Sequence, residues 1–332
     1  MRYLAHRTLH GALILFGVSI ITFLIPHLTT SPEAIAHQVL GIRAQPSAYK
    51  LFIHQNYLDR SWPQQYWHWL WGLLHGNLGL SYNPNSLGVP VKGLIGANMW
   101  RSFFFVVPPT IAAVLVAIPL GLFQAFRRNK PFDYAATTAV FVLYSTPAAL
   151  LCVIMQQYLT QSWVPVLHPQ GTVNTNAQEV SGAAFPWYML HNFEYFVLPM
   201  LALLLLTVGG LSRFMRGSAL DTLVQDYVRT ARAKGASTSR VMFRHVLRPS
   251  TIPVITILGL SVPVILSGAL IIEAAFNFPG MGILTVASTQ LNDIPTVLAI
   301  TLILSFATVI GNLLADVCMV LVDPRIRFEG RK

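Results

Sequence analysis

The sequence predicts an all-α polytopic membrane protein with six transmembrane helices and with both termini in the cytoplasm. Three observations support this fold class. Of the 332 residues, 54% are hydrophobic and only 10% are charged, whereas soluble domains carry roughly 25% charged residues. Six apolar stretches are close to the length that crosses about 30 Å of hydrocarbon. Finally, the basic residues are distributed unevenly between the segments that join these stretches.

The N-terminal part is predicted to contain a first transmembrane helix, residues 1–29, followed by an extracellular segment, residues 30–98. The apolar run at 9–28 follows a basic start, and no small-residue cleavage site closely follows it. We therefore expect a retained helix with its N-terminus inside rather than a cleaved signal peptide. The segment 30–98 is too polar and broken to span. Within it, the run WPQQYWHWLWGLL predicts an amphipathic helix at the membrane interface, where Trp and Tyr are favoured.

The core, residues 99–322, is predicted to contain five further spans. Their expected bounds are about 101–126, 133–159, 194–211, 252–272 and 294–322. Proline and glycine residues make several of them irregular: Pro108, Pro109 and Pro119 are expected to kink the second span, Pro147 lies in the middle of the third, and Gly268 lies in the fifth. The stretches 160–192 and 273–293 are expected outside, and the tail 323–332 inside.

The distribution of Lys and Arg tests this topology. The predicted inner segments hold 17 of the 22 Lys and Arg residues, and the outer segments hold five. Basic residues are retained preferentially on the cytoplasmic side of membrane proteins. The asymmetry therefore supports six spans with both termini inside, and it explains the net charge of +10 without nucleic acid as a partner.

The inner loop 213–250 carries the densest group of basic residues. Its sequence predicts two short helices around Gly235, which suits a left-handed turn. The first helix is expected to run back to about Leu220, because an apolar stripe at helical spacing is formed by Leu220, Leu223, Val224, Tyr227, Val228 and Ala231. Ser237 is expected to cap the second helix, and Pro249 to limit it. On this second helix, a ridge of positive charge is expected from Arg240, Arg244 and Arg248.

Several kinds of site are poorly supported. The chain has no GxxxxGK[ST] phosphate loop, no HExxH pair and no Gly-x-Ser-x-Gly elbow, and its ten His residues are scattered. Cys152 and Cys318 both lie in apolar runs, which favours packing over a disulfide or a metal site. We expect a protein that is not an enzyme and that binds no cofactor. From pattern alone, the basic loop has two readings: a hairpin on anionic lipid headgroups, or a contact for a cytoplasmic partner.

The stretch RTARAKGASTSRVMFRHVLRPSTIPV resembles the cytoplasmic loop of ABC importer permeases, whose motif is written EAA-x3-G-x9-I-x-L-P. Residues 230–234 occupy its first part and Gly235 its glycine, while His245 and Arg248 stand where Ile and Pro would be. These two departures look like the peptide-permease branch. In that family the two short helices are the coupling element, seated in a groove of the ATP-hydrolysing subunit.

Other stretches resemble the same branch, namely the dipeptide, oligopeptide and nickel permeases and their first permease subunit. They are MRYLAHRTL, NYLDRSWPQQYWHWLWGLLHGNLGLSY, EAAFNFPGMGILTVAS and LVDPRIR. There are also departures. Asn77 replaces a usual acid, residues 30–33 replace Pro-Gly-Asp-Pro, and the outer loop 160–192 is long. The last two departures bear on substrate or on binding-protein docking.

The resemblance implies a type I ABC importer permease in a prokaryotic cytoplasmic membrane. The implied partners are a second homologous permease subunit, two cytoplasmic ATPase domains that use ATP and Mg, an extracellular substrate-binding protein and the lipid bilayer. The implied cargo is a dipeptide or oligopeptide, with nickel, glutathione or another small solute as alternatives. Two rivals from other classes are an ion-coupled secondary transporter, which needs a repeat and mid-membrane ionisable groups, and a membrane-anchored nucleic-acid binder.

The resemblance also assigns candidate coupling residues, and the turn at Gly235 is the firmest of them. The full set is Asp226, Arg229, Thr230, Ala231, Ala233, Lys234, Gly235, Ala236, Arg240, Arg244 and His245. The cationic members, together with Arg232, would pair with acidic groups of an ATPase; alternatively they are solvated charges of an inner loop, or they pair internally with Asp226.

Three polar residues are candidates for the translocation path or a gate: Glu273, Asn277 and Asp316. Glu273 is alternatively an interface cap or a partner within the outer loop, and Asp316 is equally suited to packing against a second permease subunit. The run FNFPGMG that contains Asn277 has turn chemistry. It predicts either a short re-entrant element near the binding protein or a plain connecting loop.

Overall fold

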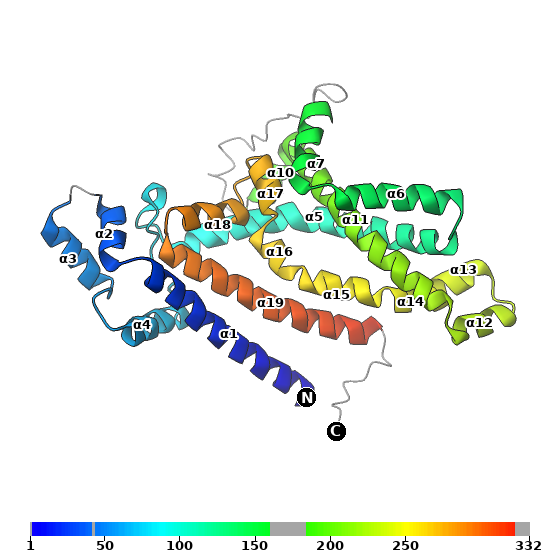
Figure 1. Ribbon diagram of the computed structural model, residues 1–332, viewed down its shortest axis with the longest axis horizontal. Coiled ribbons are helices and arrows are strands. Elements are labelled where there is room, and N and C mark those ends of the chain that lie inside the picture. Colours follow the sequence, from blue (N-terminus) through cyan, green and yellow to red (C-terminus); the bar gives the residue numbers. More distant parts are fainter. Residues whose placement is uncertain (1, 42–43, 160–183, 323–332) are drawn as a thin grey trace.

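The computed structural model describes residues 2–41, 44–159 and 184–322, and these residues are almost entirely helical. The expected outer loop 160–192 falls largely outside them, and the tail 323–332 falls entirely outside. The molecule is elongated, and its long helices run along its longest axis (Figure 1). Five helices are long and apolar enough to cross a membrane, and one bent helix pair raises the number to six. The described part of the chain therefore agrees with an all-α polytopic membrane protein.

The predicted first and last spans coincide with long helices, α1 (Arg2–Thr29) and α19 (Ile294–Val322). They pack side by side. Between α1 and the core, the outer segment forms three helices and a short 3-10 turn. They are α2 (Pro32–Leu40), α3 (Pro46–Gln55), α4 (Trp62–Leu74) and η1 (Pro84–Ser86). The predicted interfacial helix WPQQYWHWLWGLL is thus confirmed as a helix.

The centre of the fold is the pair formed by α5, Val91–Phe126, and α11, Phe193–Leu223, which pack along most of their length. Their close approach needs a glycine, because a Cβ at Gly121 would lie 2.6 Å from the Ser212 carbonyl oxygen. Both helices exceed the expected spans: α5 begins ten residues earlier than 101, and α11 continues twelve residues past 211. Pro108, Pro109 and Pro119 all lie inside α5 without ending it.

The third span was expected to be one helix over 133–159, and this expectation is wrong. It is a pair, α6 (Pro131–Ser145) and α7 (Ala148–Ile154), the latter continued by a wide π-turn over Met155–Leu159. The two arms are bent by 104°. Pro147 explains the break, since it lacks an N–H, and the preceding Thr146 adopts the extended conformation that proline imposes, with φ −75° and ψ 124°.

The inner loop after α11 differs from the prediction in two respects. The first loop helix does not run back to Leu220, because α11 ends at Leu223 and the extended Gln225 separates it from α12, Asp226–Ala233. Pro249 does not end the second helix either. The chain stays helical through α13 (Thr238–Arg240), a π-turn (Val241–Val246), α14 (Leu247–Ser250) and α15 (Ile252–Leu260). The wider turn before Pro249 relieves the clash of its ring with the preceding turn.

The fifth span is interrupted at its outer end. Helix α16, Val262–Ser267, stops at Gly268, whose φ is +79°, and α17 covers Leu270–Ala275. The expected outer connection 273–293 is itself partly helical, since α18 spans Met281–Gln290. A short helix α10, Phe185–His191, precedes α11. Helices α2 and α3 lie at the opposite end of the molecule from α12 and α13 (Figure 1), as the predicted outside and inside placements require.

Candidate functional site

The basic hairpin is built around Gly235, which has φ +78°. The Gly235 N–H donates to the Arg232 carbonyl at 2.9 Å, and the Ala236 N–H donates to the Ala231 carbonyl at 3.1 Å. This left-handed glycine closes the end of α12 and reverses the chain. The Ser237 hydroxyl then accepts from the Arg240 N–H at 3.4 Å, which confirms it as the cap of the second helix.

One face of this hairpin is fixed to the membrane helices. Val228, Val241 and Val246 are fully buried. They belong to a core cluster with the inner ends of α5 and α11, which also includes Leu122, Ala125, Met215 and Ala219. A buried hydrogen bond of 3.0 Å joins the hydroxyls of Ser250 and Thr222. The hairpin and the inner ends of α5 and α11 therefore form one close-packed unit, which resists deformation.

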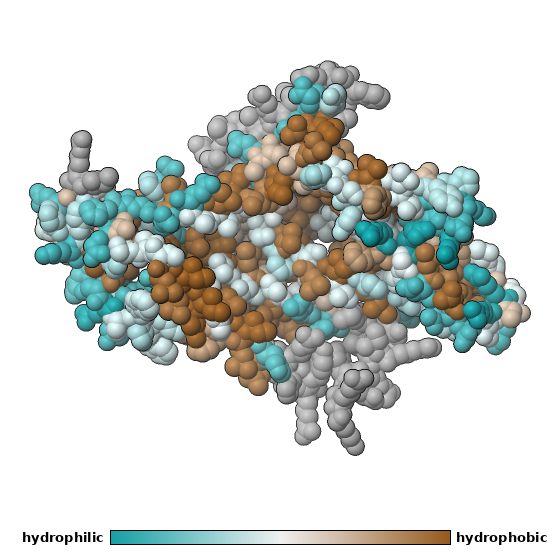
Figure 2. Space-filling view, in the orientation of Figure 1, coloured by the Kyte–Doolittle hydropathy of each residue, from teal (hydrophilic) through white to brown (hydrophobic). Residues whose placement is uncertain are grey.

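The other face of the hairpin is exposed and positively charged. The exposed cations are Arg229, Arg232, Lys234, Arg240, Arg244 and Arg248. Within the hairpin, Arg229 Nη1 lies 3.8 Å from Asp226 Oδ1. Two aromatic side chains are also exposed, Tyr227 at 45% and Phe243 at 53%. Figure 2 shows hydrophilic surface over this end of the molecule.

The remaining predicted residues also lie on the hairpin and carry no charge on its exposed face. Thr230 bonds the Asp226 carbonyl through its hydroxyl at 2.9 Å, and Ala233 is exposed at the end of α12. Ala231, Ala236 and His245 are half-buried. The structure therefore brings all the predicted coupling residues together on one two-helix unit.

Behind the hairpin lies an ion pair that sequence reasoning missed. Arg216 of α11 donates from Nε and Nη2 to the two carboxylate oxygens of Asp133 in α6, each at 2.9 Å. The Asn129 N–H also donates to Asp133 at 3.1 Å. Asp133 is 2% exposed. Neighbouring Arg213 lies over the Tyr144 ring at 5.3 Å. These contacts fasten the inner arm of the bent third span to α11.

At the outer end, Glu273 is fully buried at the centre of a polar cluster. Its Oε1 accepts from the Ser102 hydroxyl at 2.9 Å, and its Oε2 accepts from the backbone N–H groups of Gly282 and Ile283 at 2.8 and 3.3 Å. The Met281 N–H in turn donates to the Ser102 oxygen at 2.8 Å. Glu273 thus holds the N-terminus of α18, where a negative charge is favoured.

Glycine makes this cluster possible. A Cβ at Gly268, Gly280 or Gly282 would lie 1.9, 2.5 or 2.8 Å from the Glu273 carboxylate. The turn between α17 and Gly280 contains Asn277, which is exposed and has φ +49°. Phe278 follows and is fully buried, stacked on Phe105 of α5 at 4.3 Å between ring centroids. The FNFPGMG run is therefore a folded cap packed onto α5.

Asp316 does not join Glu273 and Asn277. It lies 22 residues along α19, about 33 Å from the outer end of that helix, and it is half-buried.

A second outer cluster that sequence reasoning missed surrounds Asp293, which accepts from the Ser81 and Thr296 hydroxyls at 2.5 and 2.7 Å and from the Tyr82 N–H at 2.8 Å. This buried carboxylate joins the outer segment to the start of α19.

Between α5, α11 and the fifth span lies a cavity of about 220 Å³. Its polar lining consists of hydroxyls, those of Thr110, Thr207 and Ser261, among apolar side chains such as Leu206 and Phe214. No charged side chain lines it. In the described residues, no group of three or more His, Cys, Asp or Glu is placed to hold a metal ion.

Comparison with known proteins places this arrangement in a family. Residues 117–328 match the model of the binding-protein-dependent transport system inner membrane component, and residues 1–90 match the N-terminal model of the same membrane components. The oligopeptide transport system permease protein AppB of Bacillus subtilis is 33% identical, over 98% of this chain and 99% of that protein.

Two further relatives also align over nearly their whole length. A putative peptide permease protein of Brucella suis is 31% identical, over 98% of this chain and 99% of that protein. The glutathione transport system permease protein GsiC of Escherichia coli is 30% identical, over 99% of this chain and 100% of that protein. The chain belongs to the family of binding-protein-dependent transport system inner membrane components, the multi-pass permeases of bacterial importers.

Proposed function

We propose that this chain is one of two permease subunits of an ATP-driven ABC importer for peptides. The observation that carries the cargo assignment is the full-length similarity to proteins named for oligopeptide and peptide transport. The neutral cavity between α5, α11 and the fifth span supports it. A wall of apolar groups and hydroxyls accepts peptide backbones through hydrogen bonds without selecting one charged side chain.

The surfaces of the hairpin support the proposed partners. The exposed basic face of the hairpin fits an acidic groove on a cytoplasmic ATPase domain, while its buried face transmits the movement to α5 and α11. Two such ATPase domains bind and hydrolyse ATP with Mg, and a second, homologous permease completes the path. An extracellular binding protein delivers the cargo to the outer end. This chain itself supplies no covalent chemistry.

Reconstitution tests the proposal. The permease is co-expressed with the proposed ATPases, second permease and binding protein, purified, and placed in liposomes. Labelled peptides of two to five residues are then added outside the liposomes. We expect uptake that needs internal ATP and the binding protein. Uptake that persists without ATP and follows an ion gradient would instead establish a secondary transporter.

Glutathione is the second candidate cargo, because the relative named for glutathione transport matches the whole chain at 30% identity. Glutathione is a tripeptide whose first peptide bond is formed by the glutamate side chain, which distinguishes it from an α-linked tripeptide. Competition separates the two cargoes: excess glutathione is expected to leave uptake of an α-linked tripeptide unchanged if the importer is a general peptide system, and to abolish it if glutathione is the preferred cargo.

A further inference from the structure

Helix α4 carries an aromatic face that nothing in the described chain covers. Trp67, Trp71 and Leu74 are 62%, 55% and 70% exposed. They lie four and three residues apart, so they form one stripe along the helix, and the rings of Trp67 and Trp71 stack at 6.4 Å. The opposite side of α4 faces the protein, where Gln65 is 8% exposed.

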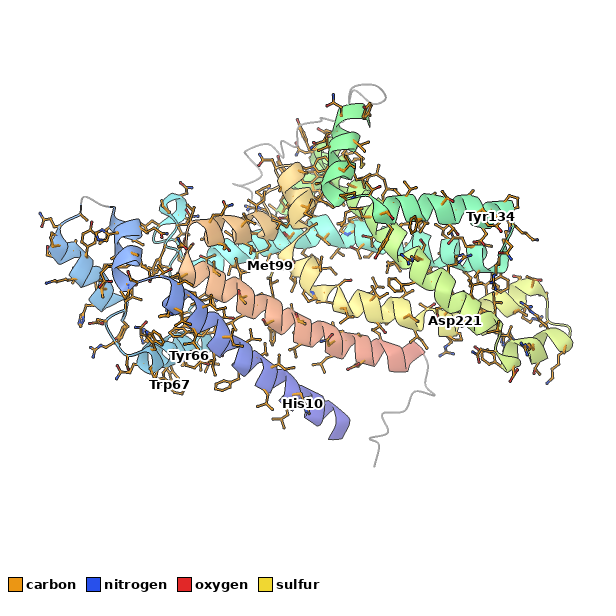
Figure 3. The ribbon with its side chains drawn as sticks, in the orientation of Figure 1. His10, Tyr66, Trp67, Met99, Tyr134 and Asp221 are labelled. Atoms are coloured by element: carbon orange, nitrogen blue, oxygen red, sulfur yellow. The ribbon has the colours of Figure 1, made fainter. Side chains whose placement is uncertain are left out.

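The contacts of α4 place it at the depth of the outer leaflet. The Tyr66 hydroxyl is 2.7 Å from the Ser19 hydroxyl, Trp69 lies 5.7 Å from Phe23, and Gln65 Oε1 is 2.8 Å from His27 Nε2. Phe23 and His27 precede the outer end of α1 by six and two residues, or about 9 and 3 Å along the helix axis. Figure 3 shows Tyr66 and Trp67 on α4 beside α1.

The neighbouring surface of α1 is itself suited to lipid. Leu13, Ile21 and Ile25 are 61%, 60% and 56% exposed, and Figure 2 shows hydrophobic surface along α1. The aromatic stripe of α4 therefore continues a lipid-facing surface. Trp side chains are favoured at this boundary, because their rings are apolar and their N–H reaches the polar layer.

A shallow groove on the same side of α4 adds a cation to this surface. Its lining residues are Tyr57, Arg60, Pro63, Gln64, Trp67, His68 and Trp71. The stacked rings of Tyr57 and His68, 4.0 Å apart, form one wall. The backbone of Arg60 is fixed, because its carbonyl accepts from Gln65 Nε2 at 2.8 Å.

The Arg60 side chain is 51% exposed and, within the described residues, makes only a long ion pair. Its nearest acid is Asp59, with 3.9 Å between Arg60 Nε and Asp59 Oδ1, which is beyond hydrogen-bond distance. The other Asp59 oxygen is 2.8 Å from His54 Nδ1. This hydrogen bond lowers the pKa of Asp59. Asp59 is thus occupied by His54, while the guanidinium of Arg60 presents a donor fork that matches a phosphate.

Behind the Tyr57–His68 wall lies a second cavity of about 470 Å³, which shares both residues with the groove. Its lining is mixed, with Phe23, Leu58 and Trp69 among the apolar residues and Gln55, Asn56 and Asn77 among the polar ones. A basic, tryptophan-lined groove beside the exposed apolar surface of α1 matches a molecule with a phosphate and hydrocarbon chains. A peptide or an aqueous protein partner would not explain the depth of α4 beside Phe23.

We propose that this groove binds a glycerophospholipid of the outer leaflet, with Arg60 donating to its phosphate and with an acyl chain lying along Trp67, Trp71 and Leu74. The bound lipid holds α4, and through it the outer segment, at the membrane surface. The site does not depend on the identity of the transported cargo.

The test uses the complete transporter, purified and stripped of loosely bound lipid, and measured by native mass spectrometry with added 1-palmitoyl-2-oleoyl-phosphatidylglycerol. We expect one tightly bound lipid in the wild-type complex and about a tenfold loss of occupancy in Arg60→Gln. Lys92→Gln is the matched control, because Lys92 is an exposed cation at the start of α5 outside the groove. It should bind as the wild type does.

Two additional arms define the chemistry. Dioleoylglycerol, which lacks the phosphate, should not bind, and millimolar inorganic phosphate, which lacks the chains, should not displace the phospholipid. Equal occupancy in Arg60→Gln and wild type would overturn the proposal. So would a disulfide crosslink from Trp67→Cys to a cysteine introduced into the second permease subunit, which would show that protein covers this face.

Discussion

The hydroxyl of Ser102 in α5 donates to the buried carboxylate of Glu273 in α17 at 2.9 Å, across 171 residues of sequence. The same carboxylate accepts from the first N–H groups of α18. One acceptor thus joins three elements at the outer end, and the predicted outer connection is a folded cap rather than a plain loop.

Replacing Glu273 with Gln should weaken this cap. The amide is nearly the same size as the carboxylate. However, one of the two oxygens that accept hydrogen bonds is replaced by an NH2 group, which cannot accept them. We therefore expect a loss of about 1 to 3 kcal/mol in the free energy of unfolding. Thermal unfolding of the purified complex measures this loss. Glu194→Gln, a half-buried carboxylate at the start of α11, is the control. Equal melting temperatures for both variants would show that the cap does not need the charge.

The turn of the hairpin should be sensitive to β-branching. Gly235 has φ +78°, a conformation that strains Val by more than about 1 kcal/mol. We expect Gly235→Val to insert normally and to lose most ATP-driven uptake while ATP hydrolysis continues. Gly217→Val is the control, because a side chain at this helical glycine meets open space. Uptake at the wild-type rate in Gly235→Val would exclude a coupling role for the turn.

Charge reversal on the exposed face should weaken assembly with the ATPases. We expect Arg240→Glu and Arg244→Glu each to lower affinity about tenfold, with the wild-type affinity falling as salt is raised. Binding of the purified ATPase domain to permease in nanodiscs provides the measurement. Arg128→Glu reverses an exposed inner cation outside the hairpin. Identical effects at all three positions would indicate general electrostatics rather than a docking face.

The Asp133–Arg216 pair should behave as a unit. Asp133→Asn removes a bidentate partner and leaves a partly buried guanidinium with weaker acceptors, so we expect a loss of about 2 kcal/mol. The double variant Asp133→Asn with Arg216→Gln should lose less than the sum of the two single variants. A double-mutant cycle on thermal unfolding measures the coupling, and strict additivity would contradict a direct role for the pair.

Local chemistry made several features predictable. Gly235 was identifiable because glycine reaches positive φ without strain, Ser237 because hydroxyls cap helices, and α4 because aromatic residues recur within a helical run. The topology followed from the charge asymmetry. These signals operate within a few residues of the chain, or on its composition.

Features that depend on distant partners were not predictable. Asp133 and Arg216 are 83 residues apart. The sequence alone places Glu273 in or near a loop, and only the fold brings Ser102 beside it. The apolar stripe across Val224 favoured one helix, but the chain breaks at Gln225 so that Val228 can turn into the core beneath the hairpin. Pro249 was expected to stop a helix. The π-turn before it could not be predicted, because the prediction assumed regular α-helical spacing.

The helical run that Pro249 fails to interrupt has a mechanical consequence. From Thr238 to Ser267, α13, the π-turn, α14, α15 and α16 follow one another without a residue of positive φ. The exposed cationic face of the hairpin lies at one end of this run, and the Glu273 cap follows its other end. Gly268, which has φ +79°, separates the run from the cap, so it is the residue at which a tilt of the run would change the angle to the cap.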